Sequence, residues 1–173
     1  QTKSRRCNSS FFIIIDFFGR EHEARFYLES EIDDACILII NDMHDDLEVS
    51  EISDSTPKIG SEVFNVAAPR GFFMPGSPLI FSGIYSGPIN LGELFTIASE
   101  QGSSGSPVYT RAGKVISMIY GYPIPPGYEV TDNVRVITNS SQGVGLTVIR
   151  NLLQKIKFRD DVIKLTTITS TVN

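Results

Sequence analysis

The sequence has 173 residues, of which 41% are hydrophobic and 20% charged, so it can build the core of one globular domain or of two small barrels. Its formal net charge is −5 and its basic residues do not cluster beyond residues 3–6, which argues against a nucleic-acid-binding protein. No apolar run approaches the roughly 18 residues that a membrane-spanning helix requires, so we expect no membrane span.

Short β-rich runs, separated by turn signals, follow one another along most of the chain. The first run, residues 11–15, is too short to be more than a buried strand. Only residues 148–158 carry apolar side chains at helical spacing. Many strands followed by one terminal helix are typical of an all-β barrel fold. The predicted turns lie at residues 17–19, 41–46, 69–71, 75–78 and 123–127.

Residues 41–54 form an acidic segment that looks like a linker between two halves of the chain. Its carboxylates are Asp42, Asp45, Asp46, Glu48, Glu51 and Asp54. The glycine and the closing glutamate of an EF-hand loop are missing, so a solvated acidic loop is favoured over a calcium site. We therefore predict no metal site.

Residues 101–108 read Gln-Gly-Ser-Ser-Gly-Ser-Pro-Val and place Ser104 in a glycine-rich turn that a proline ends. Such a loop exposes one hydroxyl and points two peptide N–H groups at one place, as a nucleophile beside an oxyanion hole requires. Gly102 allows a backbone conformation closed to other residues, and Gly105 keeps the far side of Ser104 clear. The alternative for a cluster of glycine and serine is an ordinary polar turn.

The residues after this loop exclude one class of nucleophile. An α/β-hydrolase elbow continues into a helix, whereas here the sequence predicts a strand at 108–110, a turn at 111–113 and a second strand at 114–121. A serine loop of this pattern, followed by a hairpin that ends in glycine, resembles the trypsin-like (chymotrypsin-clan) serine peptidases. Within that clan it is most similar to the high-temperature-requirement proteases.

The resemblance runs from about residue 11 to residue 158. Residues 19–25 are similar to the hairpin before the family's catalytic aspartate, and residues 33–39 to the strand that carries it. Residues 59–71 are similar to the strand that opens the second barrel, and residues 143–158 to the last strand and terminal helix. The resemblance implies an all-β, trypsin-like double β-barrel, with the first barrel incomplete, and a C-terminal helix. It divides the chain into a first-barrel remnant with the acidic linker (1–56), the second barrel with its helix (57–158) and a C-terminal extension (159–173).

The same resemblance implies roles for single residues. Ser104 is the nucleophile, the N–H groups of Gly102 and Ser104 form the oxyanion hole, and Asp33 orients the catalytic histidine. Asp34 is the nearest competitor of Asp33, for which a turn or strand-edge carboxylate remains the alternative. The residues implied at the substrate pocket are Ala98 at its floor and Met118, Ile119, Tyr120 and Gly121 along its wall. A floor without a carboxylate favours small or medium apolar side chains over Arg or Lys, and no cofactor is implied.

The general base of a catalytic triad has no match in this sequence. The two histidines are His22, within the hairpin, and His44, in the acidic segment, whereas the family's histidine would fall near residues 2–7. We therefore expect a processed or split serine endopeptidase, inactive alone, whose first strands and histidine lie on a second polypeptide and whose substrate is a peptide or protein. The alternative is a catalytically inactive trypsin-like module with a structural or binding role in a larger assembly, in which residues 159–173 could add a strand to a neighbour's sheet.

Overall fold

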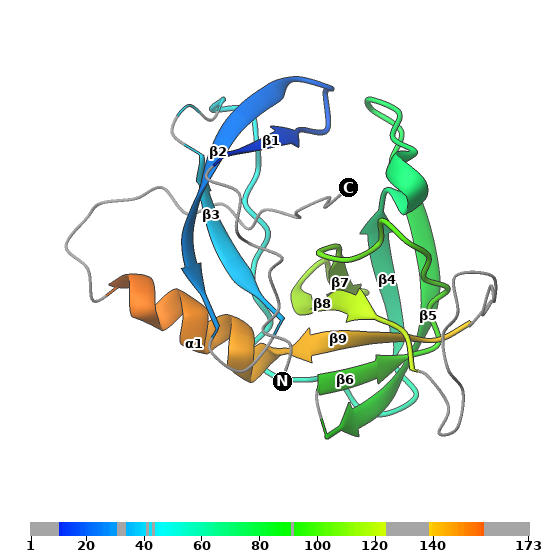
Figure 1. The fold of residues 1–173 in the computed structure, drawn as a ribbon. Coiled ribbons are helices and arrows are strands. Elements are labelled where there is room, and N and C mark those ends of the chain that lie inside the picture. Colours follow the sequence, from blue (N-terminus) through cyan, green and yellow to red (C-terminus); the bar gives the residue numbers. More distant parts are fainter. Residues whose placement is uncertain are drawn as a thin grey trace, which may run out of the picture.

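The computed structural model describes residues 11–30, 34–40, 42, 44–90, 92–123 and 139–157, and strands are its main regular structure (Figure 1). In chain order the elements are β1 (Phe12–Ile15), β2 (Glu21–Glu29), β3 (Cys36–Ile40), β4 (Glu62–Ala67), the short 3-10 helix η1 (Pro69–Gly71), β5 (Leu79–Ile89), β6 (Gly92–Phe95), β7 (Pro107–Thr110), β8 (Val115–Gly121), β9 (Ser141–Gly145) and the helix α1 (Leu146–Lys157). The prediction of an all-β fold with one C-terminal helix is confirmed. Helix α1 begins two residues earlier than predicted, and residues 158–173 lie outside the described part of the chain.

Strands β1, β2 and β3 form an antiparallel sheet in that order. Its core contains Ala24, Leu38 and Ile40, with Phe12 and Ile14 packed against them. The other face of β1 is open, with Ile13 54% and Ile15 50% exposed. The prediction of a buried strand at residues 11–15 is therefore wrong for Phe11, Ile13 and Ile15, because β1 pairs with β2 alone among the described strands and alternate residues point to opposite faces.

Strands β4 to β9 close into an antiparallel barrel in the order β4-β5-β6-β9-β8-β7. The predicted strand, turn and strand after the serine loop are confirmed as β7, a turn and β8. The barrel interior is apolar, and Val63, Phe95, Val108 and Ile119 are among its fully buried residues. Closure leaves β7 paired with β4 on one side and with β8 on the other. The strand that follows the serine loop is therefore held from both sides.

Helix α1 joins the three-stranded sheet to the barrel. Ala35, Val144 and Leu152 form one buried cluster, contributed by the residue before β3, by β9 and by α1. Met118 and Tyr120 of β8 pack against this cluster. In Figure 1 the helix lies beside β3 at the end where β9 leaves the barrel. The chain that enters β3 therefore lies close to β8. Among the described residues, no helix is both long and apolar enough to cross a membrane.

A buried carboxylate, that of Asp16, organises the turn between β1 and β2. Its Oδ1 accepts hydrogen bonds from the N–H groups of Phe18 and Arg20, each at 2.9 Å. Its Oδ2 accepts from Arg20 Nε at 2.6 Å and from His22 Nε2 at 3.0 Å. Burial raises the pKa of this carboxyl, but the hydrogen bonds from His22 and Arg20 outweigh burial, so the pKa of Asp16 lies well below its usual range.

The same group of side chains ties the hairpin to the acidic segment. Arg20 donates to both carboxylate oxygens of Asp46, at 3.0 and 2.9 Å, and His22 Nδ1 lies 3.1 Å from the carbonyl oxygen of Asp42. Both atoms that face the His22 ring are acceptors, so both ring nitrogens must carry a proton for both bonds to form. We call Asp16, Arg20, His22, Asp42 and Asp46 the Asp16 cluster. The acidic segment, predicted as a solvated linker, thus contributes two anchors to the first sheet.

Asp16→Asn should lower the free energy of unfolding at neutral pH by about 2–3 kcal/mol, because it removes the charged acceptor of these hydrogen bonds. The pKa of Asp16 in the folded chain lies below the ordinary value of about 3.9 in the unfolded chain. The stabilisation by its carboxylate is therefore fully present above about pH 4 and is lost as the pH falls below that value. Thermal unfolding followed by circular dichroism should show Tm falling more steeply below pH 4 in the wild type than in Asp16→Asn.

Asp54→Asn, at an exposed position of the linker, is the matched control. It should leave the neutral Tm and the acid slope close to those of the wild type. Parallel acid slopes for the wild type and Asp16→Asn would show that the Asp16 carboxylate is not the group that carries the acid sensitivity.

Candidate functional site

The nucleophile loop, residues 101–106, precedes β7 and consists of two successive tight turns. Gly102 has φ +93° and Gly105 has φ +87°, a region of backbone conformation that residues with side chains rarely adopt. A Cβ at Gly102 would also lie 2.7 Å from the backbone nitrogen of Arg70 and 2.9 Å from the carbonyl oxygen of Ala68. The loop therefore needs glycine at position 102 for two reasons, its conformation and its close approach to η1.

Ser104 lies half-buried at the second turn, and its hydroxyl donates to the carbonyl oxygen of Tyr120 at 3.3 Å. Two backbone bonds fasten the loop to β8 beside this contact. Gly105 N–H donates to the Ile119 carbonyl at 2.7 Å, and Ile119 N–H donates to the Ser106 carbonyl at 2.9 Å. The structure thus brings the predicted nucleophile next to the strand that was predicted to form the wall of the substrate pocket.

The residues predicted at the substrate pocket differ in exposure. The Ile119 side chain lies in the barrel core, so only its backbone is turned to the nucleophile loop. Ala98 is exposed, and Met118, Tyr120 and Gly121 are half-buried. Residue 98 is an alanine and so carries no carboxylate.

The N–H groups of Gly102 and Ser104 donate no hydrogen bond to any residue that the structure describes. The carbonyl groups of the same two peptide units, those of Gln101 and Ser103, do accept hydrogen bonds. Each of these peptide units is therefore bound at its carbonyl and has, within the described part of the chain, no partner at its N–H. Two such N–H groups beside a serine hydroxyl are the elements of an oxyanion hole.

Arg70 binds the carbonyl of the peptide unit between Gln101 and Gly102, a role that the sequence did not predict. Its backbone N–H donates to the Gln101 carbonyl at 2.7 Å, and its side-chain Nε donates to Glu100 Oε2 at 2.7 Å. With φ +57°, Arg70 is the one residue other than glycine with positive φ in the described chain. Residues 69–71 were recognised as a turn, but nothing in that pattern indicates that Arg70 takes a left-handed conformation beside the loop, as Gly71 after it also does (φ +73°).

Asp33, the predicted acid, lies outside the described residues, and its assignment stays a prediction. The nearest described residues bear on its position. Its competitor Asp34 is exposed, and Ala35 is buried in the cluster to which Met118 and Tyr120 belong. The chain next to position 33 therefore approaches the strand whose carbonyl accepts the Ser104 hydroxyl.

Both histidines lie together in the first half of the chain. His22 is buried, with its two nitrogens directed at oxygen atoms of the Asp16 cluster. The ring of His44 packs edge-on against that of His22, with 5.7 Å between ring centroids. Neither histidine forms a hydrogen bond with Ser104. The arrangement supplies a hydroxyl and two N–H groups at the nucleophile loop, without an imidazole from these two residues.

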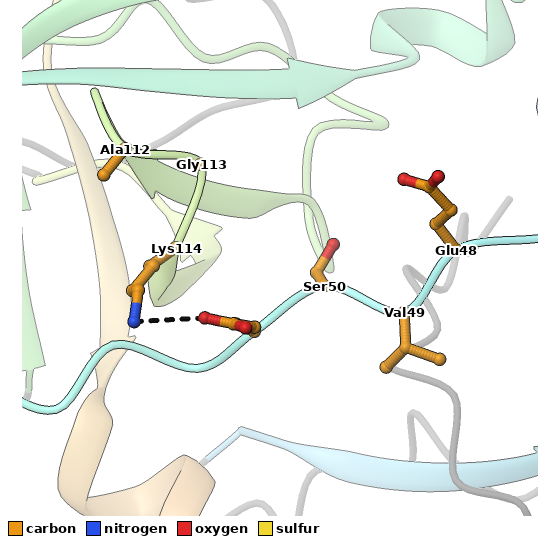
Figure 2. Close-up of a pocket in the computed structure, with 7 residues that line it drawn as sticks. Glu48, Val49, Ser50, Ala112, Gly113 and Lys114 are labelled. Atoms are coloured by element: carbon orange, nitrogen blue, oxygen red, sulfur yellow. Dashed lines mark ion pairs between the residues drawn. The ribbon is translucent and has the colours of Figure 1, made fainter.

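A pocket of about 400 Å³ lies where the acidic segment crosses the turn between β7 and β8 (Figure 2). Glu51 and Lys114 form an ion pair of 3.0 Å across it, and the Val115 N–H donates to the Glu51 carbonyl at 2.8 Å. The residues that line it are Glu48, Val49, Ser50, Glu51, Ala112, Gly113 and Lys114. None of them belongs to the nucleophile loop. This pocket therefore lies where the linker contacts the barrel and is not the candidate site.

No family model and no curated protein matches this sequence. Solved structures do match the fold. The chain is similar to Rv3671c from M. tuberculosis H37Rv, solved as an inactive form with a serine-to-alanine mutation, with a TM-score of 0.58 and 18% identity over 83% of this chain and 69% of that chain. A second structure of the inactive Rv3671c protease gives a TM-score of 0.57 and 16% identity over 80% of this chain and 68% of that chain.

The chain is also similar to the HtrA-type protease AlgW, solved as a serine-to-alanine variant with a decapeptide. The TM-score is 0.62 and the identity 17%, over 83% of this chain. The chain spans only 43% of the AlgW chain. At these identities the likeness concerns the fold alone. Together with the closed barrel and the terminal helix, it shows that this chain has the trypsin-like protease fold.

Proposed function

We propose that this chain is a serine endopeptidase of trypsin-like fold, in which Ser104 attacks the carbonyl carbon of a peptide bond. The N–H groups of Gly102 and Ser104 then stabilise the negative charge that forms on the carbonyl oxygen. The observation that carries the proposal is a pair of N–H groups that meet no acceptor among the described residues, beside a half-buried hydroxyl in a loop that β8 and η1 hold. Asp33 would orient the general base, and the burial of Ala35 in the cluster against which Tyr120 packs supports that placement.

The general base comes from another polypeptide in this proposal. His22 could act as a base only by giving up its bonds within the Asp16 cluster. Among the described strands β1 pairs with β2 alone, so its other edge offers the place at which a further strand would extend the first sheet. A strand added there would pair with β1 through backbone hydrogen bonds and could bring the missing histidine with it.

The substrate in this proposal is a peptide or protein with a small or medium apolar side chain at the cleaved bond. Ala98, at the predicted pocket floor, carries no charge that could pair with Arg or Lys. The carbonyl groups at the end of β8 lie beside Ser104 and suit an extended peptide, whose N–H groups need acceptors. Residues 1–56 and 57–158 are the two halves between which such a peptide would lie.

A second candidate is a catalytically inactive module with a structural or binding role in a larger assembly. One observation favours it, since the Ser104 hydroxyl donates to a backbone carbonyl and both histidines are engaged with each other and with the Asp16 cluster. The two candidates differ in what happens at Ser104 when a base is supplied.

Labelling of Ser104 by a fluorophosphonate separates the two. The base-supplied form is the uncut precursor, or, for a split protein, this chain together with the second polypeptide. The isolated chain should react at least about 100-fold more slowly than the base-supplied form, because a positioned general base contributes roughly 10²–10⁴ in rate. The adduct should map to Ser104 by peptide mass spectrometry. Ser104→Ala should abolish it, while Ser77→Ala, at an exposed serine remote from the loop in sequence, should not. Failure of both forms to react would favour the inactive module, and fast reaction of the isolated chain would contradict the requirement for a second polypeptide.

Gly102→Ala tests the oxyanion hole. Its Cβ would meet the backbone at Arg70 and Ala68, so the loop must move and the Gly102 N–H must change direction. We expect the labelling rate of the base-supplied form to fall about 10²–10³-fold, the loss that follows removal of one oxyanion donor. Gly113→Ala is the matched control, because Gly113 also has positive φ (+76°) but no atom lies within 4 Å of its added Cβ. Equal rates for the two variants, after correction for the folded fraction, would argue against the oxyanion hole.

A further inference from the structure

Asn65 is a buried polar side chain that the proposed chemistry does not use. It lies on β4 between Val63 and Ala67, points into the second barrel and is 1% exposed. A polar group in such a place costs free energy unless its hydrogen bonds are formed. Its Nδ2 donates to Ser106 Oγ and to the Pro107 carbonyl oxygen, each at 2.8 Å. The Pro107 carbonyl can only accept, which requires that the nitrogen and not the oxygen of the amide faces the loop.

Ser106 connects Asn65 to the backbone of the nucleophile loop by hydrogen bonds. Its hydroxyl accepts from Asn65 and therefore has its single proton left for another acceptor. That acceptor is the carbonyl oxygen of Ser103, at 2.6 Å. The backbone N–H of Ser106 donates to the same oxygen at 3.1 Å. The Ser103 carbonyl is thus held by two donors, and Asn65 determines the direction of the closer one.

The Ser103 carbonyl and the Ser104 N–H belong to one planar, trans peptide unit and point in opposite directions. A donor that holds the carbonyl toward the barrel interior therefore holds the N–H toward the opposite side, where it meets no acceptor among the described residues. We propose that Asn65 and Ser106 form a positioning pair that fixes the direction of the Ser104 N–H. This inference rests on the proposed function, because it concerns one of the two N–H groups of the oxyanion hole.

The loop needs such a pair at this peptide unit. Glycine lies on each side of the segment, at 102 and 105, and glycine lowers the cost of alternative backbone conformations. The peptide unit before Gly102 is held by the backbone of Arg70, which no substitution of a side chain removes directly. The unit before Ser104 is held by the Ser106 N–H and, in addition, by the side chains of Ser106 and Asn65, which can be changed one at a time.

The first test is Ser106→Ala, which removes the hydroxyl and keeps the backbone bond. In the uniformly ¹⁵N-labelled chain, the ¹⁵N and ¹H chemical shifts of the Ser104 amide should move clearly and its hydrogen-exchange rate should change. The chemical shifts of the Gly102 amide should stay near their wild-type values. In the base-supplied form the rate of fluorophosphonate labelling at Ser104 should fall tenfold or more. Asn65→Ala should act in the same direction, and the double variant should lose no more than the larger single loss, because the two residues act through one hydrogen-bond chain.

Ser117→Ala is the matched control. Ser117 is a fully buried serine of the same barrel whose hydroxyl also donates to a backbone carbonyl, that of Val144 at 2.8 Å. Its loss should lower Tm but leave the Ser104 amide signal and the labelling rate of folded protein unchanged. If Asn65→Ala fails to fold, Ser106→Ala still decides the question.

The two proposals fail in different ways. A Ser104 amide signal that is the same in Ser106→Ala as in the wild type, or that moves equally in Ser117→Ala, overturns the positioning pair whatever the labelling shows. A wild-type chain that never labels at Ser104, even with a base supplied, contradicts the peptidase but leaves the amide measurement valid. A shifted amide in Ser106→Ala alone supports the positioning pair in either case.

Discussion

Two carbonyl groups, those of Gln101 and Ser103, control the geometry of the candidate site. Because a peptide unit is rigid and trans, the donor that binds its carbonyl oxygen also sets the direction of the N–H on its far side. Arg70 in η1 is the donor for Gln101, and Ser106 at the start of β7 is the donor for Ser103. These donors are in place because β4, which leads into η1, pairs with β7 in the closed barrel.

The first sheet uses its ionisable groups in another way. In the Asp16 cluster a carboxylate, a guanidinium and an imidazole satisfy one another, so each becomes part of the scaffold. Both ring nitrogens of His22 face oxygen atoms of the first sheet and the acidic segment, so neither is directed at the Ser104 hydroxyl. The chain therefore has a pair of oriented N–H groups in the barrel loop, whereas the contacts of its two histidines stabilise the first half of the chain. Under the proposed function, stabilisation of the oxyanion therefore falls to the barrel loop, and removal of the proton falls to a group other than His22 and His44.

The sequence predicted the features that depend on neighbouring residues. Glycine at 102 and 105 signals positive φ, and both have it. Helical spacing located α1, and the hairpin of β7 and β8 followed from its turn. The missed features join distant residues, since the partners of Asn65 lie 41 and 42 residues away and Asp46 lies 26 residues from Arg20. A single asparagine in a strand looks the same in a sequence whether it faces solvent or a serine loop, and only barrel closure distinguishes the two.

The strain at Arg70 bears on whether the nucleophile loop is an ordinary polar turn. A left-handed conformation costs a residue with a side chain about 1–2 kcal/mol, which glycine at the same position would avoid. The exposed ion pair with Glu100 contributes too little to offset that cost. The strained backbone instead directs its N–H to the Gln101 carbonyl, and it lies so close to Gly102 that a Cβ there would be 2.7 Å from the Arg70 nitrogen. A turn with no role beyond connecting two strands gives no reason to keep this strain, whereas an oxyanion hole requires the orientation that the strain maintains.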